Sequence, residues 1–270
     1  MKNLKALKKL LDELHKKYNH RKFVHPDPLE FLYYYDDPLD REIVGLIAAS
    51  LAYGNVWQIL KSVASVLERL GPLPRAFILE RSDKQFKKNF ADFKHRFTTG
   101  DDVVNLLVGA KRAIKKRGSL HNSFLSYFSD EDENVLPALC GFVDEITSGF
   151  SFTHTGFISS PDAKSACKRL NLFLRWMVRR DEVDPGGWND IPRSKLVVPL
   201  DTHMHKIAIM LGLTRRKQAD IKTALEITDA FKKIEPDDPV KYDFVLTRFG
   251  IRNDERFRFE SLCARFCTFL

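Results

Sequence analysis

A lysine and an aspartate in the second half of the chain have the residue types that amine catalysis requires. Lys168 begins the segment KRLNLFLRWMV, and Asp201 follows Pro-Leu in LVVPLDTHMH. A lysine attacks carbon as the neutral amine, and a cation beside it, such as Arg169, favours that form. A carboxylate at a helix N-terminus accepts hydrogen bonds from the first amides, which favours its charged form. The pair therefore suits attack by an amine, with a carboxylate that stabilises positive charge.

Two helices are expected to carry these side chains. The first, residues 166–180, has an apolar face at the helical period. Its members are Leu170, Phe173, Leu174 and Met177. The second begins abruptly at Asp201, because Pro199 cannot continue an incoming helix, and it stops near Gly212. The connection over 181–200 contains Pro-Gly-Gly and is long enough to return the chain, so the amine and the carboxylate are predicted to share one site.

The rest of the chain is predicted to form helices and loops. Helices are expected over 2–17, over 40–71 with Asp40 as the cap, in short pieces of 77–128, over 220–233 and over 240–251. An acidic loop at 129–136 and a Ser/Gly/Thr-rich loop at 149–168 separate them. No segment alternates apolar and polar residues as a half-buried strand does. The expected fold class is therefore all-α.

Composition and charge favour an ordinary globular protein with a basic surface. The 270 residues are 44% hydrophobic and 30% charged, which argues against disorder. The net charge is +8, which a polyanionic partner and a merely solvated basic surface explain equally well. No run approaches the roughly 20 apolar residues of a membrane helix, and the first residues lack the apolar stretch of a secretory signal. Reduced thiols and a cytoplasmic location are expected, since the four cysteines form no Cys-x-x-Cys pair.

Three segments carry a resemblance to known families. VVPLDTHMHKIAIMLGL resembles the aspartate-bearing segment of the helix-hairpin-helix DNA glycosylases. CKRLNLFLRWMVRR resembles the helix that carries the lysine nucleophile in their archaeal GO branch, which excises 8-oxoguanine. Together with DPVKYDFVL, these segments are also similar to an uncharacterised bacterial family of unknown function. The resemblance covers roughly the last 110 residues, with weaker similarity near residues 41–60.

The chain departs from the endonuclease III branch of these glycosylases at three places. The Leu-Pro-Gly-Val-Gly hairpin that grips a DNA phosphate is absent, and DPGGW, residues 184–188, is the one glycine-rich candidate to replace it. Val183 stands at the spacing of the endonuclease III lysine, so the nucleophile follows the archaeal branch alone. Near the C-terminus, Cys263 and Cys267 are too few for a four-cysteine cluster. No iron–sulfur cluster, metal or other cofactor is expected.

The resemblance implies a fold, an activity and a partner. The fold is one helical domain over 1–270, with two helical subdomains, an active-site cleft between them and a divergent hairpin. The activity is that of a base-excision repair DNA glycosylase and AP lyase that removes an oxidised purine, 8-oxoguanine above others. Lys168 would form a Schiff base with the sugar, and Asp201 would be the catalytic carboxylate. The partner would be damaged double-stranded DNA, bound by a monomer at the nucleoid in the cytoplasm.

The resemblance also nominates side chains for the flipped base and the DNA backbone. A base that leaves the duplex is held by stacking and hydrogen bonds in a pocket. The predicted contacts to the base or its former place in the stack are Trp176, Trp188, Phe244, Asp243, Tyr53 and Asn55. The predicted contacts to the rest of the DNA are Arg169, Arg175, Arg179, Lys195 and His203. The segment LAYGN, residues 51–55, has a competing interpretation as a glycine turn between two core helices.

Two other functions remain open. One is a helical nucleic-acid-binding protein without catalysis, which the missing glycine hairpin favours. The other is a metal-dependent hydrolase, because DTHMH offers Asp201, His203 and His205 in the His-x-His pattern of amidohydrolases. Such sites follow barrel strands and need further β/α units, whereas helices are expected here. On a helix, positions i and i+2 also point to different sides, which disfavours chelation.

Overall fold

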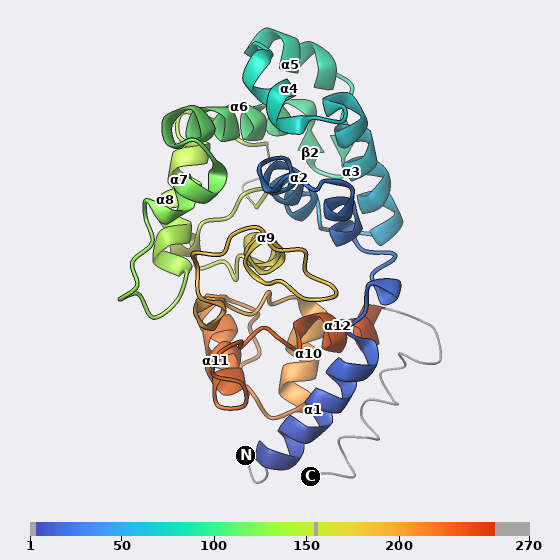
Figure 1. Ribbon diagram of the computed structural model, residues 1–270, viewed down its shortest axis with the longest axis vertical. Coiled ribbons are helices and arrows are strands. Elements are labelled where there is room, and N and C mark those ends of the chain that lie inside the picture. The colour runs from blue at the N-terminus through green and yellow to red at the C-terminus, as the bar shows by residue number, and fades with distance from the viewer. Residues whose placement is uncertain (1–3, 154–155, 252–270) are drawn as a thin grey trace.

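The computed structural model describes residues 4–153 and 156–251, and there the fold is all-α apart from one short hairpin (Figure 1). The α-helices are α1 (Leu4–Tyr18), α2 (Pro38–Ser50), α3 (Val56–Leu70), α4 (Pro74–Glu80), α5 (Asp83–Phe90), α6 (Gly100–Arg117), α7 (Leu120–Leu125), α8 (Leu136–Thr147), α9 (Lys168–Val178), α10 (Thr202–Met210), α11 (Ile221–Lys232) and α12 (Asp243–Ile251). The hairpin pairs β1 (Lys94–His95) with β2 (Thr98–Thr99). Short 3-10 helices are η1 (Arg21–Phe23), η2 (Pro28–Tyr34), η3 (Pro161–Ala163) and η4 (Arg193–Lys195).

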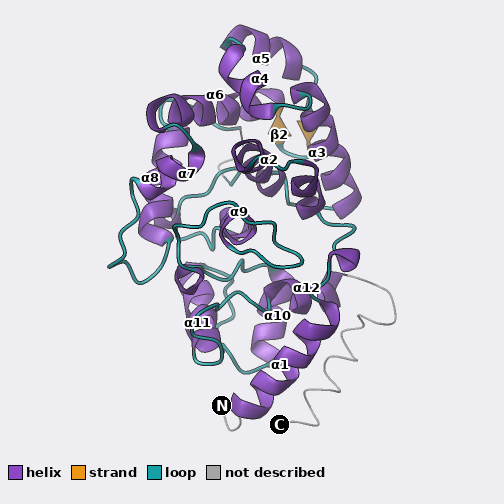
Figure 2. Ribbon diagram, in the orientation of Figure 1, coloured by secondary structure: helices purple, strands orange, loops and turns teal. Residues whose placement is uncertain are grey.

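Helix α9 lies in the middle of the molecule, with helices above and below it (Figure 1). α2 packs directly against α9, and α3 to α8 lie with α2 in the upper half of the view. The lower half holds α1, α10, α11 and α12, and there α12 contacts both α1 and α10. Long loops run past α9 on both sides (Figure 2). The division into two subdomains stays a prediction.

Gly45 allows α2 to approach α9 closely. A Cβ built on Gly45 of α2 would lie 3.3 Å from the ring of Phe173 on α9, which is tighter than an ordinary van der Waals contact. Phe173 and its neighbour Leu174 are fully buried in this contact region. Full burial of one such side chain contributes about 1.5–3 kcal/mol. The apolar face read from the sequence of α9 is therefore the surface that fixes this helix at the centre.

The tract predicted as one helical region over 40–71 consists of two helices. α2 ends at Ser50 and α3 begins at Val56, and the turn between them contains Gly54 with a φ of +99°. Asn55 caps α3, since its side chain accepts the Trp57 amide at 3.0 Å. LAYGN thus forms a glycine turn between core helices, as one of its two interpretations predicts.

The predicted cap of this tract was wrong. α2 begins at Pro38, and Asp37 caps it by accepting the Leu39 amide at 2.9 Å. Asp40 lies inside the helix, is buried, and accepts the Arg75 amide at the start of α4 at 2.7 Å. Proline at the first helical position explains why the helix starts earlier, because its fixed φ suits that position and its missing amide costs nothing there.

Candidate functional site

Lys168 and Asp201 line one cavity of about 640 Å³. Lys168 is the first residue of α9, and Asp201 is the N-cap of α10. The turn between α2 and α3 forms another part of the wall, with Tyr53 and Asn55. Small-molecule sites in proteins commonly have volumes of ~300–1,000 Å³, so this cavity has room for a nucleoside-sized group. The connection 181–200 brings the amine and the carboxylate into one cavity, as its length predicts.

Asp201 is fixed by the helix that it begins. Its Oδ1 accepts the amides of His203 at 2.9 Å and of Met204 at 2.8 Å. The predicted cap is confirmed, and this cap places a negative charge at the wall of the cavity.

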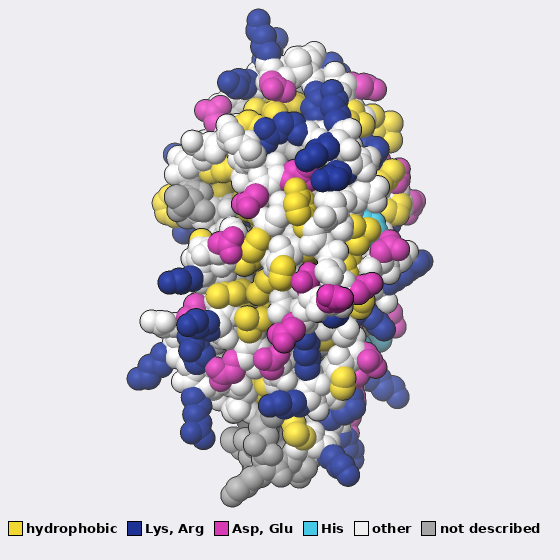
Figure 3. All heavy atoms as spheres, turned by 90° about the vertical axis from the view of Figure 1, so that its left-hand side faces the viewer, with side chains coloured by type: hydrophobic (Ala, Val, Ile, Leu, Met, Phe, Trp, Pro, Cys, Tyr) yellow, Lys and Arg dark blue, Asp and Glu magenta, His cyan; other side chains and the backbone are white. Residues whose placement is uncertain are grey.

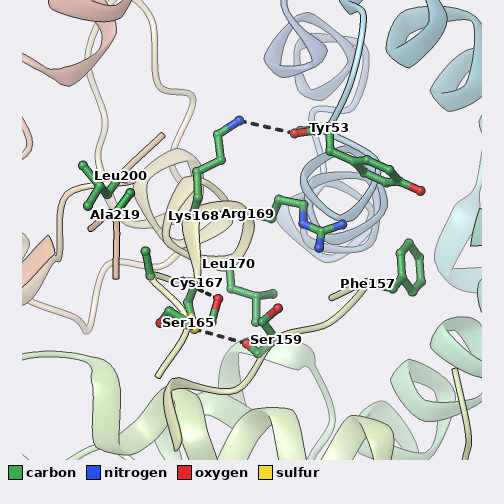
Figure 4. A pocket seen from close by; sticks show the side chains of 12 residues that line it. Tyr53, Phe157, Ser159, Ser165, Cys167, Lys168, Arg169, Leu170, Leu200 and Ala219 are labelled. Atoms are coloured by element: carbon green, nitrogen blue, oxygen red, sulfur yellow. Dashed lines mark hydrogen bonds between the residues drawn. The ribbon is translucent and has the colours of Figure 1, made fainter. Parts of the chain in front are cut away.

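The first turn of α9 is attached to carbonyls at the end of α2 and in the turn that follows it. Lys168 Nζ donates to the Ala52 carbonyl at 3.3 Å, and Arg169 Nη1 donates to the Ser50 carbonyl at 2.9 Å. Figure 4 shows the Lys168 side chain extended towards the chain beside Tyr53, with this bond dashed. Arg169 also lies over the Tyr53 ring, at 4.9 Å from its centroid, and burial lowers its pKa. The amine is therefore directed by backbone contacts, and it must leave Ala52 to attack a bound carbon.

A second cavity of about 400 Å³ adjoins the first at Lys168 (Figure 4). The two share Ala52, Tyr53, Lys168, Leu200 and Ala219. Polar groups that line only the second cavity are Ser159, Ser165 and Arg169. Cys167, the N-cap of α9, has a left-handed backbone with a φ of +48° and makes no side-chain cap in the described chain. The first amides of α9 therefore lie beside a polar hollow without a capping side chain, which suits an anion.

Arg175 and Arg179, predicted DNA contacts, are buried in a cluster of charges behind the cavity. Arg175 binds Asp184 at 3.1 Å and also Asp243, while Arg179 binds Asp238 at 3.0 Å and also Asp184. Both arginines have only 3% of their side chains exposed. The prediction was wrong for these two because a DNA phosphate cannot reach guanidinium groups enclosed by carboxylates.

Asp243 is also part of this buried cluster and does not line either cavity. Burial raises the pKa of its carboxyl to about 6, although Arg175 opposes the rise, and the charge of Asp201 adds to it. Asp243 Oδ1 has no hydrogen-bond partner in the described chain, and neither has the buried Nε1 of Trp176. Trp176 lines the Lys168–Asp201 cavity, as its predicted role requires.

Two other predicted base contacts lie in the interior. Trp188 stacks on His121 at 5.1 Å, and its Nε1 donates to Glu42 at 3.1 Å. Phe244 packs under the Arg248 guanidinium, at 4.7 Å from the ring centroid. Neither side chain lines the Lys168–Asp201 cavity and both are buried, so the structure does not place them where a base could contact them. Both aromatic side chains belong to the core instead. The sequence pattern alone does not distinguish an aromatic core residue from one that stacks on a base.

The other predicted DNA contacts are at or near the surface. His203 lines the cavity beside Asp201. Lys195 Nζ donates to the Asp130 carbonyl at 3.0 Å, which attaches η4 to the acidic loop before α8. Asp27, which no sequence motif indicates, also lines the cavity and is paired with Arg248. The segment around Asp27 reaches the cavity from far away in sequence, so only the fold reveals it.

DPGGW, the candidate replacement for a phosphate-gripping hairpin, caps α9 instead. The Gly186 amide donates to the Trp176 carbonyl at 3.0 Å, and the Trp188 amide donates to the Met177 carbonyl at 2.8 Å. Gly186 and Gly187 have φ values of +69° and +140°, which only glycine adopts readily. These amides are used within the protein and are not available to DNA.

The metal-hydrolase alternative finds no ligand set in residues 4–153 and 156–251. No group of three or more His, Cys, Asp or Glu side chains in this part is placed to hold a metal ion. His205 points away to the Arg216 carbonyl, at 2.9 Å, while Asp201 and His203 line the cavity. The predicted chelate is therefore divided, as the helical spacing implies. Cys263 and Cys267 lie outside the described residues.

Comparison with known proteins assigns a family. None of the helices in the described chain has the length and apolar character of a membrane span. Comparison with curated proteins and with solved structures gives no match. A family model described as "Protein of unknown function (DUF2400)" matches residues 27–252. This range contains α2 to α12 and, apart from Pro26, all residues that line the Lys168–Asp201 cavity, and the chain belongs to this family of unknown function.

Proposed function

We propose that the protein is a DNA glycosylase and AP lyase that removes an oxidised purine, 8-oxoguanine above others, from double-stranded DNA. The observation that carries the proposal is the shared cavity of Lys168 and Asp201, an amine and a carboxylate at the starts of two helices. The proposed fold is the helix-hairpin-helix glycosylase type with a divergent hairpin. The all-helical architecture and the position of the cavity between α9, α10 and the α2–α3 turn support it.

The reaction begins with attack of Lys168 Nζ on C1′ of the flipped nucleotide. The glycosidic bond breaks, and the base leaves with its electron pair and takes up a proton. The ring oxygen then opens to give a Schiff base between Nζ and C1′. Loss of a proton from C2′ expels the 3′ phosphate by β-elimination, and water hydrolyses the imine to release the lysine. Asp201 stabilises the positive charge that develops on the sugar as the base departs.

The walls of the two cavities have the chemistry that such a substrate needs. Tyr53 lines the Lys168–Asp201 cavity and offers aromatic surface to the base, while Trp176 lines the same cavity but is almost completely buried. Ser159, Ser165 and Arg169 line the adjoining cavity at the uncapped start of α9, where a phosphate next to the lesion would lie. Damaged DNA is the proposed partner, and a monomer at the nucleoid in the cytoplasm is the proposed state.

Borohydride trapping tests the proposal. The protein is incubated with a labelled duplex that contains 8-oxoguanine, and sodium borohydride reduces any Schiff base to a stable adduct. Wild-type protein is expected to give the adduct, and Lys168→Gln is expected to give none. Lys164→Gln is the matched control, because Lys164 is an exposed lysine four residues earlier that does not line either cavity. No adduct from wild-type protein on a panel of damaged bases would contradict the lyase activity, and an adduct from Lys168→Gln would refute the nucleophile.

A helical nucleic-acid-binding protein without catalysis is the second candidate. The observation that favours it is the hydrogen bond from Lys168 Nζ to the Ala52 carbonyl, which gives the amine a purely structural role. In that case the protein binds DNA with equal affinity whether or not a lesion is present, and no adduct forms. The trapping experiment therefore separates the two candidates.

A further inference from the structure

A third cavity, of about 430 Å³, lies between α3 and the β1–β2 hairpin. We call it the α3–hairpin groove, and its polar lining includes Gln58, Lys61, Ser62, Ser65, Lys94 and Arg96. It lies on the side of the molecule where Figure 1 shows α3 and β2, away from α8 and α11. None of these residues lines the Lys168–Asp201 cavity. The groove is therefore a separate surface feature.

The groove has an excess of positive charge. Four cationic side chains line it, Lys61, Arg69, Lys94 and Arg96, against one carboxylate, Asp92. Arg69 pairs with Asp92 at 2.7 Å, so this carboxylate is already neutralised. Lys61, Lys94 and Arg96 are exposed and form no salt bridge with a carboxylate in the described chain. Three cations without counter-charges beside neutral hydroxyl and amide groups suit a polyanion.

An exposed aromatic ring lies next to one of these cations. Phe97, at the turn of the hairpin, is 62% exposed. The Arg96 guanidinium lies over the Phe97 ring, at 5.6 Å from its centroid. Basic side chains interleaved with exposed rings are the combination that nucleic acids require, because phosphates bind the cations and bases stack on the rings. A polyanion without flat apolar groups has nothing that could stack on an aromatic ring.

The groove is joined to the catalytic cavity by Tyr53 and Gly54, which line that cavity. The Tyr53 hydroxyl donates to the His95 carbonyl at 2.9 Å, and His95 Nε2 contacts the Tyr53 carbonyl at 3.1 Å. A Cβ on Gly54 would lie 2.6 Å from the Arg96 side chain, so Arg96 lies directly over the turn. A strand with one nucleotide in the catalytic cavity would therefore continue across the hairpin.

The side of the molecule at the left of Figure 1 carries charges of both signs on the described residues. Figure 3 shows the face at the left of Figure 1, where acidic and basic side chains are interspersed over the surface. The acidic loop between α7 and α8 is on this side of the molecule in Figure 1. A polyanion is repelled and attracted there by neighbouring groups, whereas the α3–hairpin groove presents a local excess of one sign.

We propose that the α3–hairpin groove binds the backbone of the DNA strand whose nucleotide enters the catalytic cavity, and that Phe97 stacks on a base of this strand. The inference rests on the proposed function, since DNA is its partner. It assigns strand binding to Lys61, Lys94, Arg96 and Phe97, which lie outside the catalytic cavity.

The test measures binding of wild-type protein and variants to a fluorescein-labelled duplex that contains a stable abasic-site analogue. Fluorescence anisotropy gives the association constant at several potassium chloride concentrations. Lys61→Ala/Lys94→Ala is expected to reduce the slope of log K against log[salt] by about 1.8, since each phosphate contact contributes about 0.9. Phe97→Ala is expected to weaken binding roughly tenfold without changing this slope, because stacking releases no counterions.

Lys87→Ala/Lys88→Ala on α5 is the matched control, because it removes the same charge from exposed positions outside the three cavities. Equal salt slopes for the groove variant and this control would overturn the proposal, as would binding to anionic phosphatidylserine vesicles but not to DNA. If wild-type protein gives the borohydride adduct and the groove variant has the wild-type salt slope, DNA binding by the groove is refuted and the catalytic proposal is not. A reduced slope with no adduct supports the groove and refutes the catalytic proposal. Unchanged thermal unfolding of each variant shows that it is folded.

Discussion

Replacing Arg175 by methionine is expected to destabilise the fold strongly at neutral pH. The guanidinium lies between Asp184 and Asp243, whose side chains are 0% and 2% exposed. Without it, Arg179 remains the neighbour of Asp184, but Asp243 loses its cation. Breaking a buried ion pair from one side costs about 3–5 kcal/mol, because the remaining charge is left without solvent or a partner. We expect a loss in this range at pH 7.5.

The same loss is expected to be smaller at pH 5. Burial raises the pKa of Asp243 to about 6, so this carboxyl is largely neutral at pH 5 and ionised at pH 7.5. Arg175 stabilises a neutral carboxyl less than it stabilises an ionised one, so its removal costs less at pH 5. Urea unfolding followed by circular dichroism at the two pH values gives the two free energies of unfolding, and their difference from wild type is the quantity to compare.

Arg180→Met provides the control for this prediction. Arg180 is adjacent to Arg179 in sequence but exposed, so its replacement is expected to change the free energy of unfolding by less than about 0.5 kcal/mol. A loss below about 1 kcal/mol for Arg175→Met at pH 7.5 would refute the structural role of the arginine. A variant of native stability that binds DNA more weakly would instead restore Arg175 as a DNA contact.

Three further outcomes follow from the structure. Asp243→Asn is expected to flatten the pH dependence of the free energy of unfolding. In wild type the raised pKa means that the carboxyl binds its proton more tightly in the folded state, so it contributes roughly 3 kcal/mol of stability below about pH 4, and this contribution is lost as the pH rises through about 6. Urea unfolding across this pH range measures the change. Asp201→Asn is expected to slow base excision in single-turnover assays and to leave DNA affinity nearly unchanged, since asparagine can still cap α10; a large loss of affinity would make the residue mainly structural. Gly45→Val is expected to lower stability by about 1–3 kcal/mol, because the new side chain meets the Phe173 ring, and an unchanged melting temperature would show that α2 and α9 can separate.

The sequence predicts those parts of the site that depend on local structure. A proline followed by aspartate and a helical run is sufficient to place Asp201 at the start of α10, and the apolar period is sufficient to place α9. Both signals come from neighbours within one or two turns. The shared cavity follows only indirectly, from the length of the connection 181–200, which permits the contact without requiring it.

The cations of α9 show why the rest was not predictable from sequence. A helical pattern distinguishes an apolar face from a polar one and assigns the polar face to solvent. α9 has neighbours above and below it, so the face with Arg175 and Arg179 is buried as well. Their carboxylate partners include Asp238, 59 residues after Arg179, and Asp243, 68 residues after Arg175, and no local signal contains such pairings. The sequence of a buried basic helix therefore has the same pattern as that of an exposed helix that binds DNA.

The connection between α9 and α10 links the stability of the core to the geometry of the site. Its amides at Gly186 and Trp188 cap the end of α9, and its Asp184 binds both buried arginines of that helix. The same segment then delivers Asp201 to the cavity that Lys168 lines. The connection is thus held to α9 near its beginning by backbone hydrogen bonds and ion pairs, and it ends at the residue that caps α10. Weakening of the charge cluster is therefore expected to disturb the site as well as the core, even though no member of the cluster lines the cavity.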